Sequence, residues 1–345
     1  MAKTKTNPYP KLHNAAWPGT VGKGVAGAEA FIDLDTMIRL TADAEAGGAK
    51  FDGIDIALGK PHFDPDDIDG ETNRLAEKVG KYGLEVGTIV PAIWSGSAFG
   101  DDAARKRFLD AVKKGCEVGA ALRKLKLRPS GCIRIDTASG VELWAKDPEA
   151  NQKQIAETFV QACEIAADFD EVLACEGEIC WGGIHSWKRM LQILETVDRP
   201  QTLGFQADMS HTLLYLLGYN APEDRLLPEN FDWKDTAAFD AAYRKLTDAL
   251  RIWTVDLHIA QNDGTVFGSG THDKTGRHCL PKDPNGKLDI VKYAGYWLRD
   301  EDGLTKRFNH ICWDGCMFPN QTMLNPQTWN DILEAMDNVR RKHGW

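Results

Sequence analysis

The sequence has 345 residues, of which 43% are hydrophobic and 27% charged, as is typical of a folded globular protein. Its formal net charge of −10 at pH 7 repels polyanions, which argues against a nucleic-acid partner. The N-terminal residues are polar, and no apolar run suits a cleavable signal or a membrane span. The eight Cys include no Cys-x-x-Cys pair, and scattered Cys are typical of a reducing compartment, so we expect a cytoplasmic protein without a membrane partner.

Strand and helix patterns alternate along the chain. Short apolar runs predict eight strands, over residues 12–17, 53–58, 84–93, 132–136, 172–176, 202–208, 253–259 and 308–313. Amphipathic patterns predict helices over residues 33–46, 66–82, 101–121, 148–167, 185–197, 210–217, 236–250, 288–298 and 328–343.

This alternation predicts an α/β fold in which parallel strands are joined by right-handed crossovers. Eight such units suit a closed (β/α)8 barrel, the TIM barrel, formed by residues 1–345 as one domain. A doubly wound open sheet is the alternative. In this prediction residues 1–11 are a polar N-terminal extension, and residues 262–287 are a long polar loop after the seventh strand.

Two acids, Glu176 and Glu178, stand at the end of the fifth strand, directly before a Gly-rich loop. Alternate residues of a strand point to one face, so the two carboxylates should project together. Acids at the end of an apolar strand are costly to desolvate unless something compensates them, and a divalent cation is the commonest compensation that also does chemistry. The alternative is a pair of solvated loop acids.

The next three strands also end in metal-ligand types. Asp208 ends the sixth strand, His258 lies in the seventh, and Asp314 follows the eighth. Each could instead have a purely structural role: Asp208 as a helix cap, His258 as a structural His, and Asp314 as a turn residue. Because functional residues of a barrel gather at the C-terminal strand ends, we predict that Glu176, Asp208, His258 and Asp314 bind one cation. A carboxylate and imidazole shell suits Mn²⁺, Mg²⁺, Co²⁺ or Zn²⁺.

Together these residues resemble the xylose isomerase-like superfamily of sugar isomerases and epimerases, which are TIM barrels. The resemblance covers nearly the whole chain and includes Asp208-x-x-His211 after the sixth strand. It implies that Glu176 is both a metal ligand and a catalytic base, that Asp208 and His258 are ligands, and that His211 contacts a substrate hydroxyl. Endonuclease IV also belongs to this superfamily, but the acidic charge of the chain argues against such a role.

Two positions depart from the family pattern. Asp314 stands where the family usually has Glu, and because Asp is one methylene shorter it can bind metal without reaching the substrate carbon. Glu178 is an added acid that could take over that second role. The usual His-x-x-Asp after the seventh strand reads His258-Ile-Ala-Gln261, with Asp263 two residues further on.

We therefore predict a metal-dependent sugar isomerase or epimerase that acts on a keto-sugar or polyol ketone by proton transfer through an enediolate. The cofactor is one divalent ion, Mn²⁺ before Mg²⁺, Co²⁺ or Zn²⁺. Glu176 removes the proton, Glu178 or Asp314 returns it, and His211 orients a hydroxyl. A lyase that eliminates a C- or O-linked group from a 3-oxo-glycoside would use the same site. A non-catalytic sugar-binding barrel is the alternative from another class.

Further residues are predicted to contact the carbohydrate substrate. Trp17, Trp94 and Trp181 lie at strand ends, where their rings could stack on a sugar or simply pack the barrel. His185 follows the fifth strand. In the long loop, the predicted contacts are His272, Arg277 and His278; a solvated loop or an oligomer contact is the alternative. Since relatives are often dimers or tetramers, we also expect a homo-oligomer.

Overall fold

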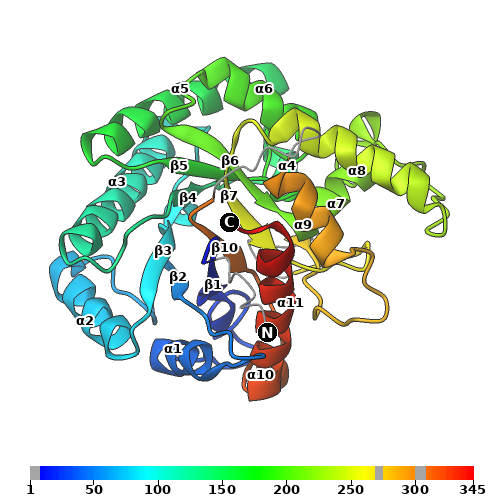
Figure 1. The fold of residues 1–345 in the computed structure, drawn as a ribbon. Coiled ribbons are helices and arrows are strands. Elements are labelled where there is room, and N and C mark those ends of the chain that lie inside the picture. The colour runs from blue at the N-terminus through cyan, green and yellow to red at the C-terminus, as the bar shows by residue number, and fades with distance from the viewer. Residues whose placement is uncertain (1–7, 269–274, 300–307) are drawn as a thin grey trace.

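The computed structural model of the protein describes residues 8–268, 275–299 and 308–345. Eight parallel strands close into a barrel in the order β1-β10-β7-β6-β5-β4-β3-β2, and Figure 1 looks along it. The predicted (β/α)8 barrel is therefore confirmed, and the alternative of an open sheet is wrong. The barrel strands are β1 (Lys11–Ala15), β2 (Gly53–Ala57), β3 (Glu85–Val90), β4 (Ile133–Ile135), β5 (Leu173–Glu176), β6 (Leu203–Asp208), β7 (Thr254–Ile259) and β10 (His310–Trp313).

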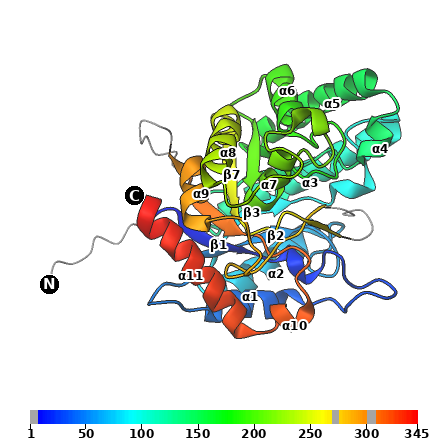
Figure 2. The same ribbon diagram turned by 90° about the vertical axis from the view of Figure 1, so that its right-hand side faces the viewer.

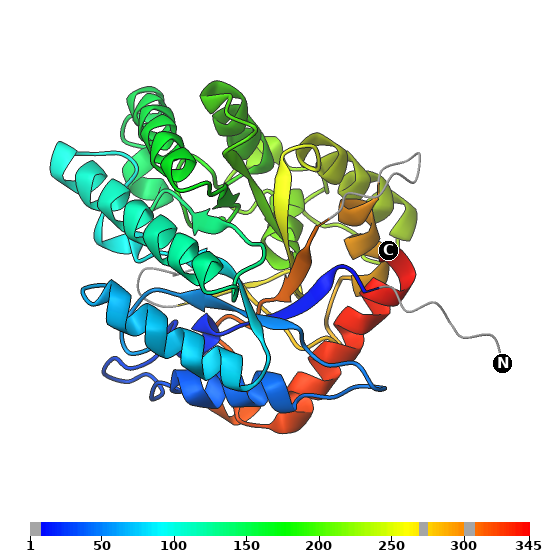
Figure 3. The ribbon, with the colours of Figure 1, turned by 60° about the vertical axis from the view of Figure 1, so that its left-hand side comes forward.

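Helices form a ring around the outside of the barrel, as Figures 1 and 3 show. The long ones are α1 (Leu34–Asp43), α2 (Ile68–Lys81), α3 (Asp102–Lys124), α5 (Pro148–Asp168), α6 (Trp187–Val197), α7 (Met209–Leu217), α8 (Thr236–Leu250), α9 (Ile290–Leu298) and α11 (Pro326–His343). Two short helices, α4 (Val141–Trp144) and α10 (Asn320–Met323), were not predicted. Over the described ranges, no helix is long and apolar enough to cross a bilayer.

Side-chain caps decide where several helices begin. Asp101 accepts a hydrogen bond from the backbone N–H of Ala104 at 2.7 Å and so starts α3. The helix predicted from His185 starts instead at Trp187, because the Ser186 hydroxyl accepts from the N–H of Arg189 at 3.2 Å. In Figure 2 the C-terminal end of α11 lies at the left and α4 lies at the right, so the loops that follow the strands gather on the right.

The long segment after β7 is not a plain loop. It contains a two-stranded antiparallel hairpin of β8 (Val266–Phe267) and β9 (Thr275–Gly276). Gln261 closes the segment at its base: its side-chain amide donates to the carbonyl of Leu288 at 2.9 Å, and its backbone carbonyl accepts from Cys279 at 2.8 Å. The hairpin therefore has a fixed position relative to the barrel mouth.

The floor of the barrel is polar, although small barrels are usually filled with branched apolar side chains. His13 Nδ1 lies 2.8 Å from Asp55 Oδ1, and His310 Nε2 lies 3.3 Å from Asp55 Oδ2. His13 Nε2 also lies 3.2 Å from Glu85 Oε1. Gly53 makes room for this cluster, since a Cβ there would lie 2.4 Å from His13 Nε2. Asp55 is thus a structural acid that lies below the C-terminal rim of the barrel.

These contacts change the proton affinities of the cluster. Burial alone would lower the pKa of His13, but the hydrogen bonds with Asp55 and Glu85 outweigh burial and raise that pKa to about 9. Burial would likewise raise the pKa of Asp55, yet the imidazoles of His310 and His13 hold it well below its usual range. His13 and Asp55 are therefore an ion pair at neutral pH.

We expect the stability of the metal-free protein to fall as the pH rises from about 6.5 to about 9. Folded His13 keeps its proton up to pH about 9, whereas the unfolded chain loses it near pH 6.5. The stabilisation, of the order of 3 kcal/mol, is complete below the lower pH and is lost as the pH passes the higher one. Urea denaturation at about pH 6 and about pH 9.5 measures this loss. Comparison with His13→Gln isolates this residue, and an equal pH dependence in that variant would exclude it as the source.

Candidate metal centre

Four potential metal ligands converge at the C-terminal mouth of the barrel. Ligand atoms of Glu176, Asp208, His258 and Asp314 all lie within 4.8 Å of one another, and every one of these residues is buried. The strand register explains this, because Asp208 on β6 pairs with His258 on β7, and His258 pairs with Cys312 on β10. Asp314 lies two residues beyond Cys312 and faces the same point. The structure thus brings together all four residues of the predicted ligand set.

Asp208 does two things with its two oxygens. Its Oδ1 accepts from the backbone N–H groups of Ser210 at 2.6 Å and His211 at 3.2 Å, which caps α7. Its Oδ2 faces the centre and lies 3.6 Å from His258 Nδ1. The helix-cap explanation and the ligand explanation, treated as alternatives in the sequence, are therefore compatible.

The donor set fits a cation. His258 Nδ1 is buried without a hydrogen-bond partner among the described residues. It lies 3.6 Å from Asp208 Oδ2 and 3.9 Å from both Glu176 Oε1 and Asp314 Oδ2. These separations are too long for hydrogen bonds, but ligands that share one ion at roughly 2.1 Å lie roughly 3 to 4 Å apart.

Asp314 is held in place by two N–H groups. The Trp17 indole nitrogen lies 3.2 Å from each of its oxygens, and the backbone N–H of Cys316 donates to Oδ1 at 2.7 Å. The Trp17 ring also stacks on His258, with centroids 5.6 Å apart. Trp17 therefore orients two of the four residues at once.

Replacing Trp17 with Phe should weaken Mn²⁺ binding about 10- to 100-fold, the usual cost of removing a group that orients a ligand. The ring remains, but Asp314 loses the indole N–H. Trp94→Phe is the matched control, because Trp94 donates to Asp136, which lies outside the four-residue set, at 3.0 Å. Titration of Mn²⁺ by calorimetry compares the two variants, and equal dissociation constants would show that the Trp17 contact does not orient a ligand.

Arg134 was not predicted, and it sits beside the two Glu residues. Its guanidinium forms an ion pair with Glu176, lies 3.5 Å from Glu178 Oε2, and lies 2.9 Å from Asp136. The sequence contained a pattern that indicates this position, because Arg134 and Asp136 alternate within a short apolar strand and so share its inner face. Burial raises the pKa of Asp136 to about 6, although Arg134 acts to lower it.

Glu178 lies just beyond the end of β5 and points to the same place as Glu176. Ligand atoms of Glu176, Glu178 and His211 lie within 4.8 Å of one another. Glu178 Oε1 accepts from the Thr275 hydroxyl at 3.3 Å, and Oε2 accepts from the Trp181 indole N–H. The predicted convergence of the two Glu side chains is therefore present in the structure.

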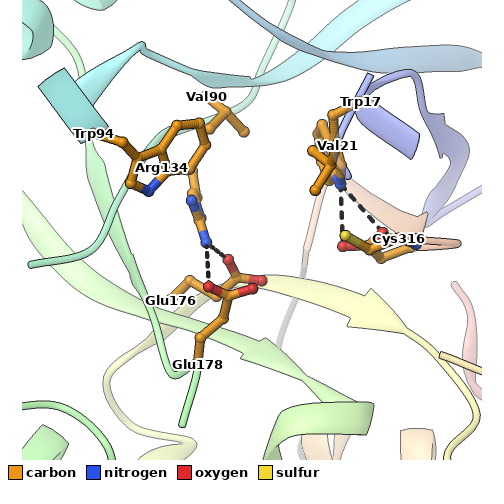
Figure 4. A pocket seen from close by; sticks show the side chains of 9 residues that line it. Trp17, Val21, Val90, Trp94, Arg134, Glu176, Glu178 and Cys316 are labelled. Carbon is orange, nitrogen blue, oxygen red and sulfur yellow. Dashed lines mark hydrogen bonds and ion pairs between the residues drawn. The ribbon is translucent and has the colours of Figure 1, made fainter. Parts of the chain in front are cut away.

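A narrow cavity, whose empty space of about 320 Å³ includes open solvent, adjoins these acids. Figure 4 shows Arg134, Glu176 and Glu178 on one side of it, and Trp17, Val21 and Cys316 on the other. Trp94 and Val90 complete an apolar upper wall. Polar groups capable of chemistry are thus at the bottom, and surfaces that suit the C–H face of a sugar are above.

The hairpin after β7 brings residues to the centre that strand ends alone would not supply. His278 Nε2 lies 3.5 Å from Asp208 Oδ2 and 3.9 Å from Asp314 Oδ2. Arg277 points elsewhere, with its guanidinium 2.5 Å from Asp263 Oδ2, so neither Arg277 nor Asp263 joins the acids. His272 lies outside the described residues.

Two other predicted substrate contacts are not at the cavity wall. His185 accepts from the backbone N–H of Gly183 at 3.2 Å and packs edge-on against Trp144, with ring centroids 4.8 Å apart. Burial, followed by the charge of Arg189, lowers the pKa of His185 to about 4. Trp181 is buried in the apolar core, and its N–H is used by Glu178. His185 and Trp181 therefore pack behind the residues that line the cavity, rather than lining it themselves.

The charged groups of the centre shift the pKa values of its imidazoles. Burial would lower the pKa of His258, but the nearby carboxylates of Asp208, Asp256 and Asp314 raise it to about 9. For His278, burial is outweighed by the charges of Asp314 and Asp208, which also raise its pKa to about 9. Asp208 has its pKa held well below the usual range by His211 and His278, despite its burial. The centre thus attracts positive charge strongly.

Comparison with known proteins agrees with this architecture. A family described as "Xylose isomerase-like TIM barrel" matches residues 42–279, which confirms the resemblance found in the sequence. No match is found among curated protein sequences. A solved D-tagatose 3-epimerase-like protein covers 96% of this chain and 99% of its own, with 14% identity and a TM-score of 0.61.

Two further solved structures share the fold. The IOLI protein with a bound zinc atom has 12% identity and a TM-score of 0.63, over 96% of this chain and 99% of its own. The 3-keto-D-glucoside 4-epimerase from E. coli has 14% identity and a TM-score of 0.56, over 95% of this chain and 98% of its own. At such identities these likenesses show the fold alone.

Proposed function

Because the chain belongs to the xylose isomerase-like TIM barrel family, we propose that it is a divalent-metal-dependent isomerase or epimerase of a keto-sugar or related polyol ketone. The observation that carries this proposal is the convergence of Glu176, Asp208, His258 and Asp314 beneath a cavity that also contains a further acid, Glu178. Solved neighbours that include a tagatose 3-epimerase-like protein and a 3-keto-glucoside 4-epimerase support the substrate class.

Glu176, Asp208, His258 and Asp314 would hold the cation, of which Mn²⁺ is our first choice. When bound, a divalent ion polarises a substrate carbonyl and makes the neighbouring C–H more acidic. Trp17 keeps Asp314 in its ligand position, and the α7 cap fixes Asp208. The site is therefore preorganised by contacts within the chain itself.

The two Glu side chains would move the proton. Glu176 would take it from the carbon next to the carbonyl, which leaves an enediolate of the substrate. Glu178 would return it, because Asp314, which also lines the cavity, is held in place by Trp17 and Cys316. Arg134 contacts both Glu residues and so fixes their oxygens, and His211, 3.4 Å from Glu178, would orient a hydroxyl.

Incubation with keto-hexoses, keto-pentoses and 3-oxo-glycosides in deuterated buffer tests the proposal. Mn²⁺-loaded protein should incorporate deuterium at the carbon beside the carbonyl and form an isomer or epimer, whereas chelator-treated protein should do neither. Proton and carbon NMR spectra identify the position of exchange. If the loaded protein gives neither exchange nor product with any substrate, the proposal fails and a sugar-binding barrel replaces it.

Elimination is the second candidate, and the apolar wall of the cavity favours it. Trp94, Val90 and Val21 line the same cavity as the acids and would pack against a leaving group attached to the sugar. Proton removal by Glu176 would be the same, but the C–O or C–C bond to the leaving group would then break. The leaving group would depart with the electron pair of that bond and take up a proton. Release of a free aglycone from a 3-oxo-glycoside, seen by chromatography, would identify this reaction.

A further inference from the structure

The hairpin of β8 and β9 packs directly on the candidate site. The hydroxyl of Thr275, a residue that is 1% exposed, donates to Glu178 Oε1 at 3.3 Å. The next residue, Gly276, lies so close to His211 that a Cβ on it would be 2.7 Å from His211 Nδ1. Consecutive residues of β9 therefore contact Glu178 and His211, two residues with proposed roles in the reaction.

Hydrogen bonds hold the chain beside Thr275 in place. The backbone N–H of Arg277 donates to the carbonyl of Thr265, on the other arm of the hairpin, at 3.1 Å. The Ser210 hydroxyl, at the start of α7, donates to the carbonyl of Arg277 at 3.3 Å. The backbone of β9 is thus tied both to its own hairpin and to the barrel, so the Thr275 hydroxyl stays within reach of Glu178.

The two oxygens of Glu178 face different kinds of group. Its Oε2 accepts from the Trp181 indole N–H, and from the Cys180 thiol at 3.6 Å. Arg134 Nη2 lies 3.5 Å from the same oxygen. Its Oε1 instead meets the Thr275 hydroxyl.

This difference favours one oxygen as the carrier of a proton. Trp and Arg side chains only donate hydrogen bonds, whereas a Thr hydroxyl both donates and accepts. A proton on Glu178 Oε2 would point at N–H groups, but a proton on Oε1 can be donated to the Thr275 hydroxyl. In the acid form of Glu178, the proton therefore belongs on Oε1.

In the proposed reaction Glu178 returns a proton to the enediolate. An electron pair of the enediolate would form the new C–H bond, and the substrate carbonyl would form again. The electron pair of the broken O–H bond would stay on Glu178, which would be left as a carboxylate. The Thr275 hydroxyl would then rotate and donate to Oε1 instead of accepting from it, so one side chain suits both states of the acid.

We propose that Thr275 is a positioning residue for proton return, which holds Glu178 so that Oε1 delivers the proton. This role rests on the proposed function, in which Glu176 removes the proton and Glu178 returns it. Loss of the Thr275 hydroxyl should slow the return by Glu178 and leave the removal by Glu176 in place. The hairpin after β7 thus decides how often an enediolate becomes product rather than reverting to substrate.

Thr275→Val tests this role, because Val keeps the shape of the side chain and lacks the hydroxyl. With a keto-sugar that the unmodified protein converts, the Mn²⁺-loaded variant should form product about 10- to 100-fold more slowly, the effect of losing one hydrogen bond to a charged group. KM and Mn²⁺ content should stay unchanged. In deuterated buffer, NMR spectra should show more deuterium in the recovered substrate per molecule of product.

Two further variants are the controls. Thr275→Ser keeps the hydroxyl and should retain the deuterium-to-product ratio of the unmodified protein. Thr265→Val removes a hydroxyl from the same segment, but Thr265 is exposed and binds Asp263 Oδ1 at 2.5 Å, so this ratio should again stay unchanged.

An unchanged deuterium-to-product ratio in Thr275→Val would overturn the role in proton return, and so would a raised KM at an unchanged kcat. Equal falls in exchange and in product formation would also overturn it, since Thr275 would then act on proton removal. If circular dichroism shows that Thr275→Val does not fold, Thr275→Ala against Thr275→Ser makes the same comparison. Absence of both exchange and product in the unmodified protein is a different result, because it is a failure of the proposed function.

Discussion

Glu176→Gln should lower the rate of deuterium exchange into the substrate about 10²- to 10⁴-fold, the usual contribution of a general base. The amide has the same shape as the carboxylate, but it cannot accept the proton. It is also a weaker ligand, so the Mn²⁺ content after gel filtration should fall as well. Glu176 is 3% exposed and bound to Arg134, so the variant leaves that guanidinium without one of its partners.

The control for this loss is Glu142→Gln, in which an exposed Glu of α4 at the same end of the barrel is changed in the same way. Exchange rate and metal content should both remain at the level of the unmodified protein. Urea denaturation of both variants separates a chemical effect from a loss of fold. Full exchange by Glu176→Gln would show that another group, with Glu178 the first to test, removes the proton.

Glu171→Ala should lower the free energy of unfolding by about 3 to 5 kcal/mol, because it breaks a buried ion pair on one side only. Glu171 lies 2.7 and 2.9 Å from Arg128 Nη1 through its two oxygens, and it also binds Arg123 at 2.7 Å. Arg128 is 1% exposed and stays charged at any ordinary pH, so it would remain as an uncompensated buried cation.

Urea denaturation measures this effect, and Asp110→Ala is its matched control. Asp110 pairs with Lys106 at 2.6 Å, but the two side chains are 56% and 75% exposed, so its loss should cost less than about 1 kcal/mol. Similar midpoints for the two variants would show that the Arg128 pair is no stronger than a surface pair. Neither Glu171 nor Asp110 belongs to the ligand set, so both substitutions should leave the metal stoichiometry unchanged.

Much of the candidate site could be predicted, because in a barrel the order of the strands along the chain decides where the strand ends lie. Once eight strands are recognised, Glu176, Asp208, His258 and Asp314 must emerge at one rim, since parallel strands in a barrel share one C-terminal end. No side-chain detail was needed for that step. The same rule says nothing about depth within the barrel, so it does not indicate that Asp55 pairs with His13 on the floor.

The positions of residues on loops were predicted less well, because a loop has no periodicity that indicates where its side chains point. Arg277 and His278 are adjacent in sequence, yet Arg277 turns to Asp263 while His278 reaches Asp208. The hairpin of β8 and β9 decides this, and its short strands leave only a weak pattern in the sequence. His185 shows the same limit, because the Ser186 cap and the Trp144 ring determine where it lies.

The sequence by itself determined the barrel, the family and the four strand-end ligand candidates, because hydrophobic periodicity and strand order depend only on neighbours along the chain. Tertiary structure alone decided which groups share one point in space. It placed Arg134 between Glu176 and Asp136, the Trp17 indole on Asp314, and His278 beside Asp208. Except for the Arg134–Asp136 pair, those contacts join residues far apart in the chain, and they arise only when side chains pack around a common centre.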